Sequence, residues 1–420
     1  MTFSILSYQS KVSFADNLLK RLKFIAGDPI TTPNRVKTGI NEYIQVVTVT
    51  YIWQTKKWPS LSWDKKALDK IRTQTLKSHL NLLKLAGQLD LVDLSTVLIE
   101  ESMETSAIEG ETLNFDDVRS SVATHLGIVQ KDNKASKSIG IVDALVDVFS
   151  KWNQELSETL IFNWHSKIMA DARSKNLIVG SYRTTTEPMR IISGGYGREK
   201  IHYQAPASKD LSRETSEFLK WFNKNHKEKE IEKEIEKEIF TNSAIAHFWF
   251  VTIHPFDDGN GRISRCLGDF SIAKSEKIGK KLFSVSKQIN KHRSEYYDVL
   301  ENTQKSNGDI TNWLLWYYKI IDLAITDSTN IIKRSVFSKK FYKHLSNYSL
   351  NERQLKVLKK LLEKYPEHFE GGLTNKKYVS IAKTSPESSK RDLKDLLEKK
   401  LLTKNPGAGR STSYSLNFNI

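Results

Sequence analysis

Twelve residues near the middle of the chain, His254 to Arg265, have the types and spacing of a phosphate-binding site. They read HPFDDGNGRISR. Gly259 and Gly261 flank Asn260, and all three residues accept left-handed backbone angles, so the turn can direct several backbone N–H groups at one anion. A helix that starts just after the turn adds the positive end of its dipole. The pattern therefore predicts a nest for phosphate at the start of a helix.

Charged side chains extend the same chemistry. Arg262 and Arg265 lie three residues apart, so on a helix they share a face and can bind further phosphate oxygens. Asp258 beside a phosphate requires a cation between them, and Mg²⁺ accepts a carboxylate together with phosphate oxygens. His254, held extended before Pro255, can take a proton from an attacking hydroxyl. We expect a di- or triphosphate site with a metal; the alternative is that a single histidine before a proline is structural.

The elements that must position this site are predominantly helical. The apolar run 242–253, NSAIAHFWFVTI, predicts a buried helix that leads into His254. Short alternating pieces around GGYG predict a β-hairpin over 189–204. Further helices are expected over 65–89, 92–110, 115–128, 136–152, 156–170, 212–225, 295–304 and 309–325. Ser157 is the expected N-cap of the helix over 156–170.

Composition sets outer limits on the class of protein. The chain has 420 residues, 39% of them hydrophobic, and its single cysteine, Cys266, excludes an intrachain disulfide. This fits a cytoplasmic location. No segment approaches the ~20 apolar residues of a membrane-spanning helix, so no membrane partner is expected.

The net charge of +16 is concentrated at the C-terminal end. Residues 331–420 hold 20 Lys and Arg against 8 Asp and Glu, a net charge of +12. Helices followed by two short strands around NPGAGRST favour a winged helix, with Ser385 as N-cap and Pro386 at the first helical position. Lys390, Arg391 and Lys394 would face DNA, with Arg410 on the wing. A solvated basic surface explains the charge equally well.

At this point the sequence resembles the Fic family. HPFDDGNGRISR matches every defined position of the pattern HPFx(D/E)GNGRxxR, and the resemblance extends over about residues 51–323. It implies a mainly α fold: a Fic helical core with a β-hairpin flap, an N-terminal helical domain and a C-terminal winged-helix domain. The expected divisions are a poorly ordered arm over 1–40, an N-terminal helical domain over 41–130, the catalytic core over 131–330 and the winged helix over 331–420.

The resemblance further implies a protein adenylyltransferase, which transfers AMP from ATP to a Ser, Thr or Tyr hydroxyl of a target protein or of itself. His254 would be the general base and Asp258 would hold Mg²⁺. The phosphates would meet the turn and both arginines, at Gly259, Asn260, Gly261, Arg262 and Arg265. A glycine at position 261 leaves room for the triphosphate orientation of AMP transfer.

A second stretch, TSAIEGE over Thr105 to Glu111, resembles the inhibitory motif (S/T)xxxE(G/N) of the same family. The resemblance implies that Glu109 pairs with Arg265 and occupies the place of the γ-phosphate. The alternatives are that Glu109 orients a water that removes AMP from a modified protein, or that it is an ordinary surface glutamate near a helix end.

Partners follow from the same reading. The hairpin over 189–204 would pair its main chain with an extended segment of the target protein, unless it is purely structural. Tyr296 and Tyr297 would line the adenine pocket, although aromatic residues at such positions are more often core. A DNA-binding regulator acting through the C-terminal module is the competing function; that module could bind a protein instead, and a homodimer is compatible with the sequence.

Overall fold

The structure is a computed structural model. It describes residues 35–37, 43–45, 50–87, 91–128, 139–170, 176–194, 198–226, 232–365, 369–407 and 412–418. Except for Arg35–Lys37, the arm expected over 1–40 lies outside the described residues, so its expected disorder stays a prediction. The three-residue strands β1 (Arg35–Lys37) and β2 (Tyr43–Gln45) form an antiparallel pair.

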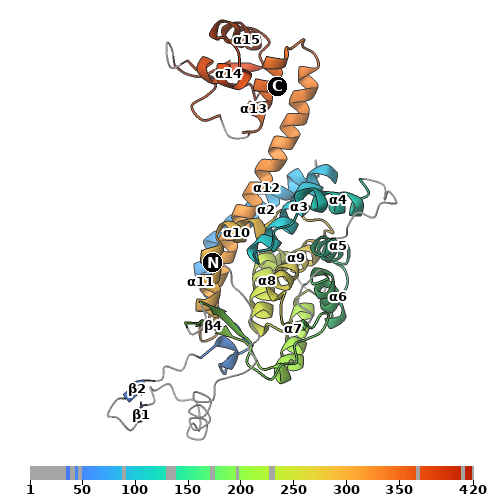
Figure 1. The fold of residues 1–420 in the computed structure, drawn as a ribbon, viewed down its shortest axis with the longest axis vertical. Helices are drawn as coiled ribbons and strands as arrows, with labels where there is room; N and C mark the ends of the chain where they lie inside the picture. The colour runs from blue at the N-terminus through green and yellow to red at the C-terminus, as the bar shows by residue number, and fades with distance from the viewer. Residues whose placement is uncertain are drawn as a thin grey trace.

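The described chain is mainly helical, as the sequence predicts (Figure 1). The helices that surround the motif are α2 (Lys65–Ala86), α3 (Leu91–Ile108), α4 (Phe115–His125), α5 (Gly140–Ser150), α6 (Glu158–Ile168), α7 (Leu211–Asn225), α8 (Glu232–Ile253), α9 (Asn260–Glu276), α10 (Val285–Lys291), α11 (Arg293–Gln304) and α12 (Thr311–Leu345). Ser157 caps α6 through a bond from the Leu160 amide, as expected. No helix in the described part of the chain is both long enough and apolar enough to cross a membrane.

The centre of the molecule is the antiparallel pair α8 and α9, joined by the motif. From residue 238 of α8 onwards, the two helices are largely buried: Phe248 and Phe250 on α8, and Ile263 and Phe270 on α9, have no exposed surface. Burial on every side explains why residues 242–253 are apolar nearly all round. The first residue of α9 is Asn260. The sequence led us to expect a start near Arg262, two positions later. The core therefore fixes where the motif begins and ends.

The N-terminal helices lie against this centre through α10 and α12. Helix α2 packs along α12, and α3 packs against α10 and α4 (Figure 1). Gly110 ends the α3 segment with φ +83°, a conformation that glycine adopts without strain. The chain therefore turns sharply at the end of α3, directly after Glu109.

The predicted hairpin is present. Strands β3 (Arg190–Ser193) and β4 (Lys200–Gln204) pair antiparallel from Arg190↔Gln204 to Ser193↔Lys200. Its turn, residues 195–197, lies outside the described residues. The Trp53 indole donates to the Gln204 carbonyl at 2.8 Å, and the Tyr203 hydroxyl donates to the Thr252 carbonyl at 2.6 Å. The first bond attaches β4 to the short helix η1 (Ile52–Gln54), and the second attaches it to the last turn of α8.

Helix α12 continues from the first core into a second, smaller one (Figure 1). The boundary expected at residue 330 falls inside this helix, and the division into domains stays a prediction. The second core is formed by α12 with α13 (Glu352–Leu362), α14 (Asn375–Ala382), α15 (Pro386–Glu398), β5 (Leu402–Lys404) and β6 (Tyr414–Leu416). Ser385 and Pro386 cap and start α15 as predicted. The expected wing residue Arg410 lies outside the described residues.

Candidate active site at the start of α9

The loop between α8 and α9 is fastened by its own side chains. Asn260 accepts a hydrogen bond from the Phe256 amide at 2.9 Å and donates one to the Phe256 carbonyl at 2.8 Å. Gly259 has φ +78° and its amide donates to the Asp258 carboxylate at 2.6 Å. The Asn260 side chain thus closes the loop, and the N–H groups of the first turn of α9 have no carbonyl of their own helix to bind. The turn therefore has the geometry of an anion nest.

His165, on α6, supports this loop. The sequence analysis did not identify it as a residue of the site. Its ring stacks on Phe256 with centroids 3.9 Å apart. Nδ1 accepts from the Gly180 amide at 2.9 Å, so Nε2 carries the proton and donates to the Asp258 carbonyl at 3.1 Å. Burial lowers the pKa of His165, which favours this neutral form. Only the tertiary structure could reveal this contact, because His165 lies 93 residues from Asp258.

The expected general base lies at the end of α8 with a free ring nitrogen. His254 is buried, and its Nδ1 lies 3.2 Å from the Val251 carbonyl. A carbonyl oxygen can only accept a hydrogen bond, so Nδ1 carries the proton. Nε2 then holds a lone pair, and this atom has no hydrogen-bond partner. Burial, reinforced by the charge of Arg183, lowers the pKa of His254 to about 4. The imidazole is therefore neutral at pH 7 and able to accept a proton.

One expectation about this residue is wrong. The position before Pro255 predicts an extended backbone, whereas φ of His254 is +51°. Left-handed angles are uncommon for a residue with a Cβ, so tertiary contacts must hold it there.

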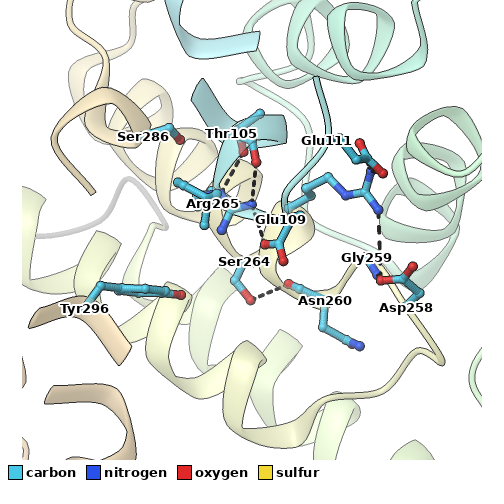
Figure 2. A network of polar contacts seen from close by, with 12 residues as sticks. Thr105, Glu109, Glu111, Asp258, Gly259, Asn260, Ser264, Arg265, Ser286 and Tyr296 are labelled. Carbon is cyan, nitrogen blue, oxygen red and sulfur yellow. Dashed lines mark hydrogen bonds and ion pairs between the residues drawn. The ribbon is translucent and has the colours of Figure 1, made fainter. Parts of the chain in front are cut away.

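Arg265 contacts the end of α3, as the family resemblance of the second motif implies. Its Nε donates to Thr105 Oγ1 at 2.7 Å, and Nη2 donates to the Thr105 carbonyl at 3.0 Å and to Glu109 Oε1 at 2.8 Å (Figure 2). Burial would raise the pKa of Glu109, but the charges of Arg265 and Arg262 outweigh it and lower the pKa. Glu109 is therefore an anion at neutral pH, held against a guanidinium that is 3% exposed.

Arg262 has a carboxylate partner that the sequence analysis missed. Its Nη1 donates to both oxygens of Glu111, at 2.8 and 2.7 Å. The Arg262 side chain is 4% exposed and that of Glu111 is 47% exposed. The sequence signal that could have predicted this pair is a second acid two positions after Glu109. The segment after α3 thus places one carboxylate on each arginine of the motif.

Three buried polar atoms around the loop have no partner in the described structure: Nε2 of His254, Nε of Arg262 and Nη1 of Arg265. Buried donors and acceptors are almost always bonded, so three orphans at one place indicate a site for a polar ligand. Two are cationic donors and the third is a proton acceptor. An anion with an attached nucleophile fits this combination.

Asp258 suits a shared metal site better than a complete one. Its carboxylate is 45% exposed, and the nearest arginine nitrogen, Nη2 of Arg262, lies 4.0 Å away. Among the described residues, no group of three His, Cys, Asp or Glu could hold a metal ion together. A cation bound by Asp258 therefore needs oxygens from its substrate, which is the usual arrangement for Mg²⁺ with phosphates.

The two tyrosines have different surroundings. Tyr296 is 2% exposed and its hydroxyl lies 3.0 Å from Nε2 of His247. Tyr297 is only partly buried, and its hydroxyl lies 3.5 Å from the carbonyl of Ile108, the residue before Glu109. Arg293 stands over the Tyr297 ring at 5.8 Å. Only Tyr297 has an accessible ring.

Helix α3, which ends just before both carboxylates, is held by a row of other acids. On α3, Glu100 binds Lys287 at 2.9 Å and Glu104 accepts from Asn290 at 2.7 Å. Between them Glu101, 1% exposed, accepts from Ser284 at 2.7 Å and lies 3.4 Å from Lys281. These contacts fix α3 on α10, so that its C-terminal end points at α9.

Two family models match this chain. The Fic/DOC family matches residues 155–271, which include the loop and most of α9. A domain of unknown function, DUF4172, matches residues 51–128, which include Glu109 and Glu111. This chain contains a Fic domain.

Curated relatives are identical to this chain at about a quarter of the aligned residues. It is 28% identical over 226 residues to "Protein adenylyltransferase Fic" of Nematostella vectensis, covering 53% of this chain and 46% of that protein. The protein of the same name from Drosophila ananassae is 25% identical over 212 residues, 49% of this chain and 36% of that protein. The chain thus spans less than half the length of these relatives.

Solved structures of Fic proteins are also similar. Fic-1 from C. elegans has a TM-score of 0.45 at 21% identity, over 64% of this chain and 75% of that one. A Fic family protein from Desulfovibrio desulfuricans G20 has a TM-score of 0.43 at 15% identity, over 82% and 95%.

A substitution at Gly261 of the Fic domain tests how closely the Glu109 carboxylate packs against α9. A Cβ at this position would lie 2.3 Å from Oε1 of Glu109. Because that atom ends a flexible side chain, Gly261→Ala should move the carboxylate off Arg265 and lower the free energy of unfolding by only about 1–2 kcal/mol. A crystal structure and urea unfolding would measure both effects.

The matched control is Gly87→Ala, since a Cβ at Gly87 meets nothing within 4 Å and φ is −62°. It should leave both the contact and the stability unchanged. A Gly261→Ala structure that keeps Glu109 at 2.8 Å from Arg265 would contradict the argument.

Proposed function

We propose that this protein is a self-inhibited adenylyltransferase, which transfers AMP from ATP to a Ser, Thr or Tyr hydroxyl of target proteins and of itself. The observation that carries the proposal is the convergence of the free Nε2 of His254 with the unpartnered nitrogens of Arg262 and Arg265 at the start of α9. The Fic domain and the names of its relatives support the same chemistry.

In the proposed reaction the target hydroxyl attacks the α-phosphorus of ATP. A new O–P bond forms, the bond between the α-phosphorus and its bridging oxygen breaks, and pyrophosphate leaves. Nε2 of His254 takes the hydroxyl proton. The amides of Asn260 and Gly261 would hold the α- and β-phosphates, because the first turn of α9 leaves their N–H groups free. The Gly259 amide, which donates to the Asp258 carboxylate in this structure, would join them once that carboxylate turns to the metal.

The remaining contacts concern the rest of the nucleotide and the target. Asp258 would hold Mg²⁺, which when bound neutralises charge on the α- and β-phosphates. Arg262 would meet the β-phosphate and Arg265 the γ-phosphate. Tyr297 would present its ring to the adenine, with Tyr296 packed behind it. The hairpin β3–β4 would hold the target segment by main-chain pairing.

Inhibition follows from the pairing of acids with these arginines. While Glu109 contacts Arg265 at 2.8 Å, a γ-phosphate has no cation to bind, and ATP can enter only with its α-phosphate turned away from the nucleophile. The same glutamate could instead orient a water for the removal of AMP, so both directions of the reaction belong in the test.

The direct test compares the wild type with Glu109→Gly, each with Mg²⁺ and α-labelled ATP. We expect self-labelling to rise at least about tenfold, since loss of the carboxylate frees a buried guanidinium. Adding His254→Ala to the variant should abolish labelling. Glu217→Gly, whose carboxylate binds Lys220 on the surface of α7, serves as control and should label like the wild type.

Equal labelling by wild type and Glu109→Gly would refute self-inhibition. Pre-labelled target incubated with each protein separates the two directions. Release of AMP by the wild type alone would assign removal to Glu109.

A second prediction concerns Glu111, which binds Arg262 through both oxygens. Glu111→Gln keeps the shape but removes the charge that competes with a β-phosphate. We expect ADP and ATP to bind about three- to tenfold more tightly by calorimetry. Labelling in the Glu109→Gly background should rise by a similar factor. Asp116→Asn, which removes an exposed carboxylate at the start of α4, is the control; equal affinities in all three proteins would exclude competition by Glu111.

Binding of DNA by the C-terminal module is the second candidate function. Lys390, Arg391 and Lys394 are exposed on α15, where a recognition helix would present them to phosphates. Replacing all three by Gln should reduce the salt dependence of DNA binding, by up to ~0.9 in slope for each lost contact. The same replacement of Lys356, Lys359 and Lys360, exposed on α13, should have less effect. Equal losses would indicate a diffuse basic surface.

A further inference from the structure

Arg183 is a buried cation that binds neutral oxygens. Its side chain is fully enclosed, with 2% of the residue exposed. Nε donates to the His254 carbonyl at 2.9 Å, Nη2 to the Pro206 carbonyl at 2.6 Å, and Nη1 to the Ser208 hydroxyl at 3.2 Å. Within the described chain no carboxylate lies within salt-bridge distance of it, unlike Arg262 and Arg265. Burial of an unpaired charge is costly, so its bonds must serve a purpose that a neutral side chain would not.

The first purpose concerns the backbone of the expected base. The Arg183 side chain holds the His254 carbonyl, and its own amide donates to the Pro255 carbonyl at 2.9 Å. Two successive peptide groups are therefore held by one residue. The first of them follows His254, whose left-handed φ of +51° must be stabilised by contacts with other residues. The direction of the imidazole depends on these peptide groups.

The second purpose concerns the hairpin. Pro206 and Ser208 follow β4 directly, so the other two nitrogens of Arg183 hold the exit of that strand. The Tyr203 hydroxyl adds a parallel connection between β4 and the last turn of α8. One guanidinium thus spans the histidine on one side and the hairpin on the other.

Charge is the third element. Burial lowers the pKa of His254 most, and Arg183 is the largest charge effect in the same direction. The charge of Glu109, directly after α3, raises the pKa of His254. Arg183 therefore favours the neutral ring while it orients it.

We propose that Arg183 is a positioning residue, which sets the His254 imidazole at a fixed place relative to the hairpin. The inference rests on the proposed function, in which the hairpin holds the target hydroxyl and His254 takes its proton. A small change in the distance between these two groups lowers the rate of the chemical step, because reaction requires near-contact of the reacting atoms. Binding of the nucleotide does not depend on it.

The kinetic test uses Arg183→Gln and Arg183→Lys in the Glu109→Gly background. For Arg183→Gln we expect kcat of labelling to fall about ten- to a hundredfold with KM for ATP within about twofold, because only alignment is lost. The lysine of Arg183→Lys keeps the charge but cannot reach three oxygens. The kcat of this variant should therefore lie between that of the Glu109→Gly parent and that of Arg183→Gln. Arg213→Gln, at an exposed arginine on α7, is the control and should keep full activity.

A readout without catalysis is the titration of His254 followed by nuclear magnetic resonance of labelled histidines, assigned by comparison with His254→Ala. In the full-length protein carrying Glu109→Gly, Arg183→Gln should raise the pKa of His254, while Arg183→Lys should leave it low. A merely structural arginine would lower the folded fraction without moving either kcat per folded molecule or this pKa.

The outcomes separate the two proposals. If Glu109→Gly labels nothing, the proposed function fails, and the titration alone decides the role of Arg183. If folded Arg183→Gln changes neither kcat nor the pKa, the positioning role is overturned. Should both Arg183 variants fail to fold, Ser208→Ala, which removes one of the three bonds, decides: a two- to fivefold lower kcat supports the proposal, and an unchanged kcat overturns it.

Discussion

Two buried guanidinium groups on one face of α9 need anions, and the rest of the site is arranged around that need. Arg262 and Arg265 are 4% and 3% exposed, too little for water to balance their charge. In this structure Glu111 and Glu109 supply the balance from a single short segment. Phosphate oxygens could supply it instead, and under the proposed function the two kinds of anion compete. The position of the end of α3 would then decide what the arginines can bind.

The loop beneath the arginines is rigid before any ligand arrives. Asn260 fastens it through both backbone groups of Phe256, and the stacked His165 fixes the Asp258 carbonyl. Such preorganisation avoids the cost of rearranging dipoles during a reaction. It also explains the depth at which the motif lies: α8 and α9 are among the most buried elements of the molecule, and their packing aligns the first turn of α9 with His254.

Helix α3 is firmly anchored, whereas the acids that follow it are more exposed. Glu101, on the helix, is 1% exposed and bound to two serines and a lysine. Glu109 and Glu111, in the segment after α3, are 32% and 47% exposed. The helix is therefore fixed on α10, while the two carboxylates that meet α9 are partly open to solvent. Gly110, which lies between the two acids, permits the turn that brings both to α9.

The sequence by itself determined the local features. The order of small residues and charges over 254–265, the apolar run before it, the caps of α6 and α15 and the hairpin over 189–204 all depend on neighbours within a few positions, and all were predictable. The pairing of Glu109 with Arg265 was expected only through a resemblance to a known family. Only the tertiary structure decided that Glu111 meets Arg262, that His165 supports the loop, that Arg183 spans the histidine and the hairpin, and that His254 is left-handed rather than extended. The physical reason is distance along the chain: Glu111 and Arg262 lie 151 residues apart and His165 and Asp258 lie 93 apart, and a hydrogen bond over such a separation is fixed by the packing of whole helices, not by the residues beside it.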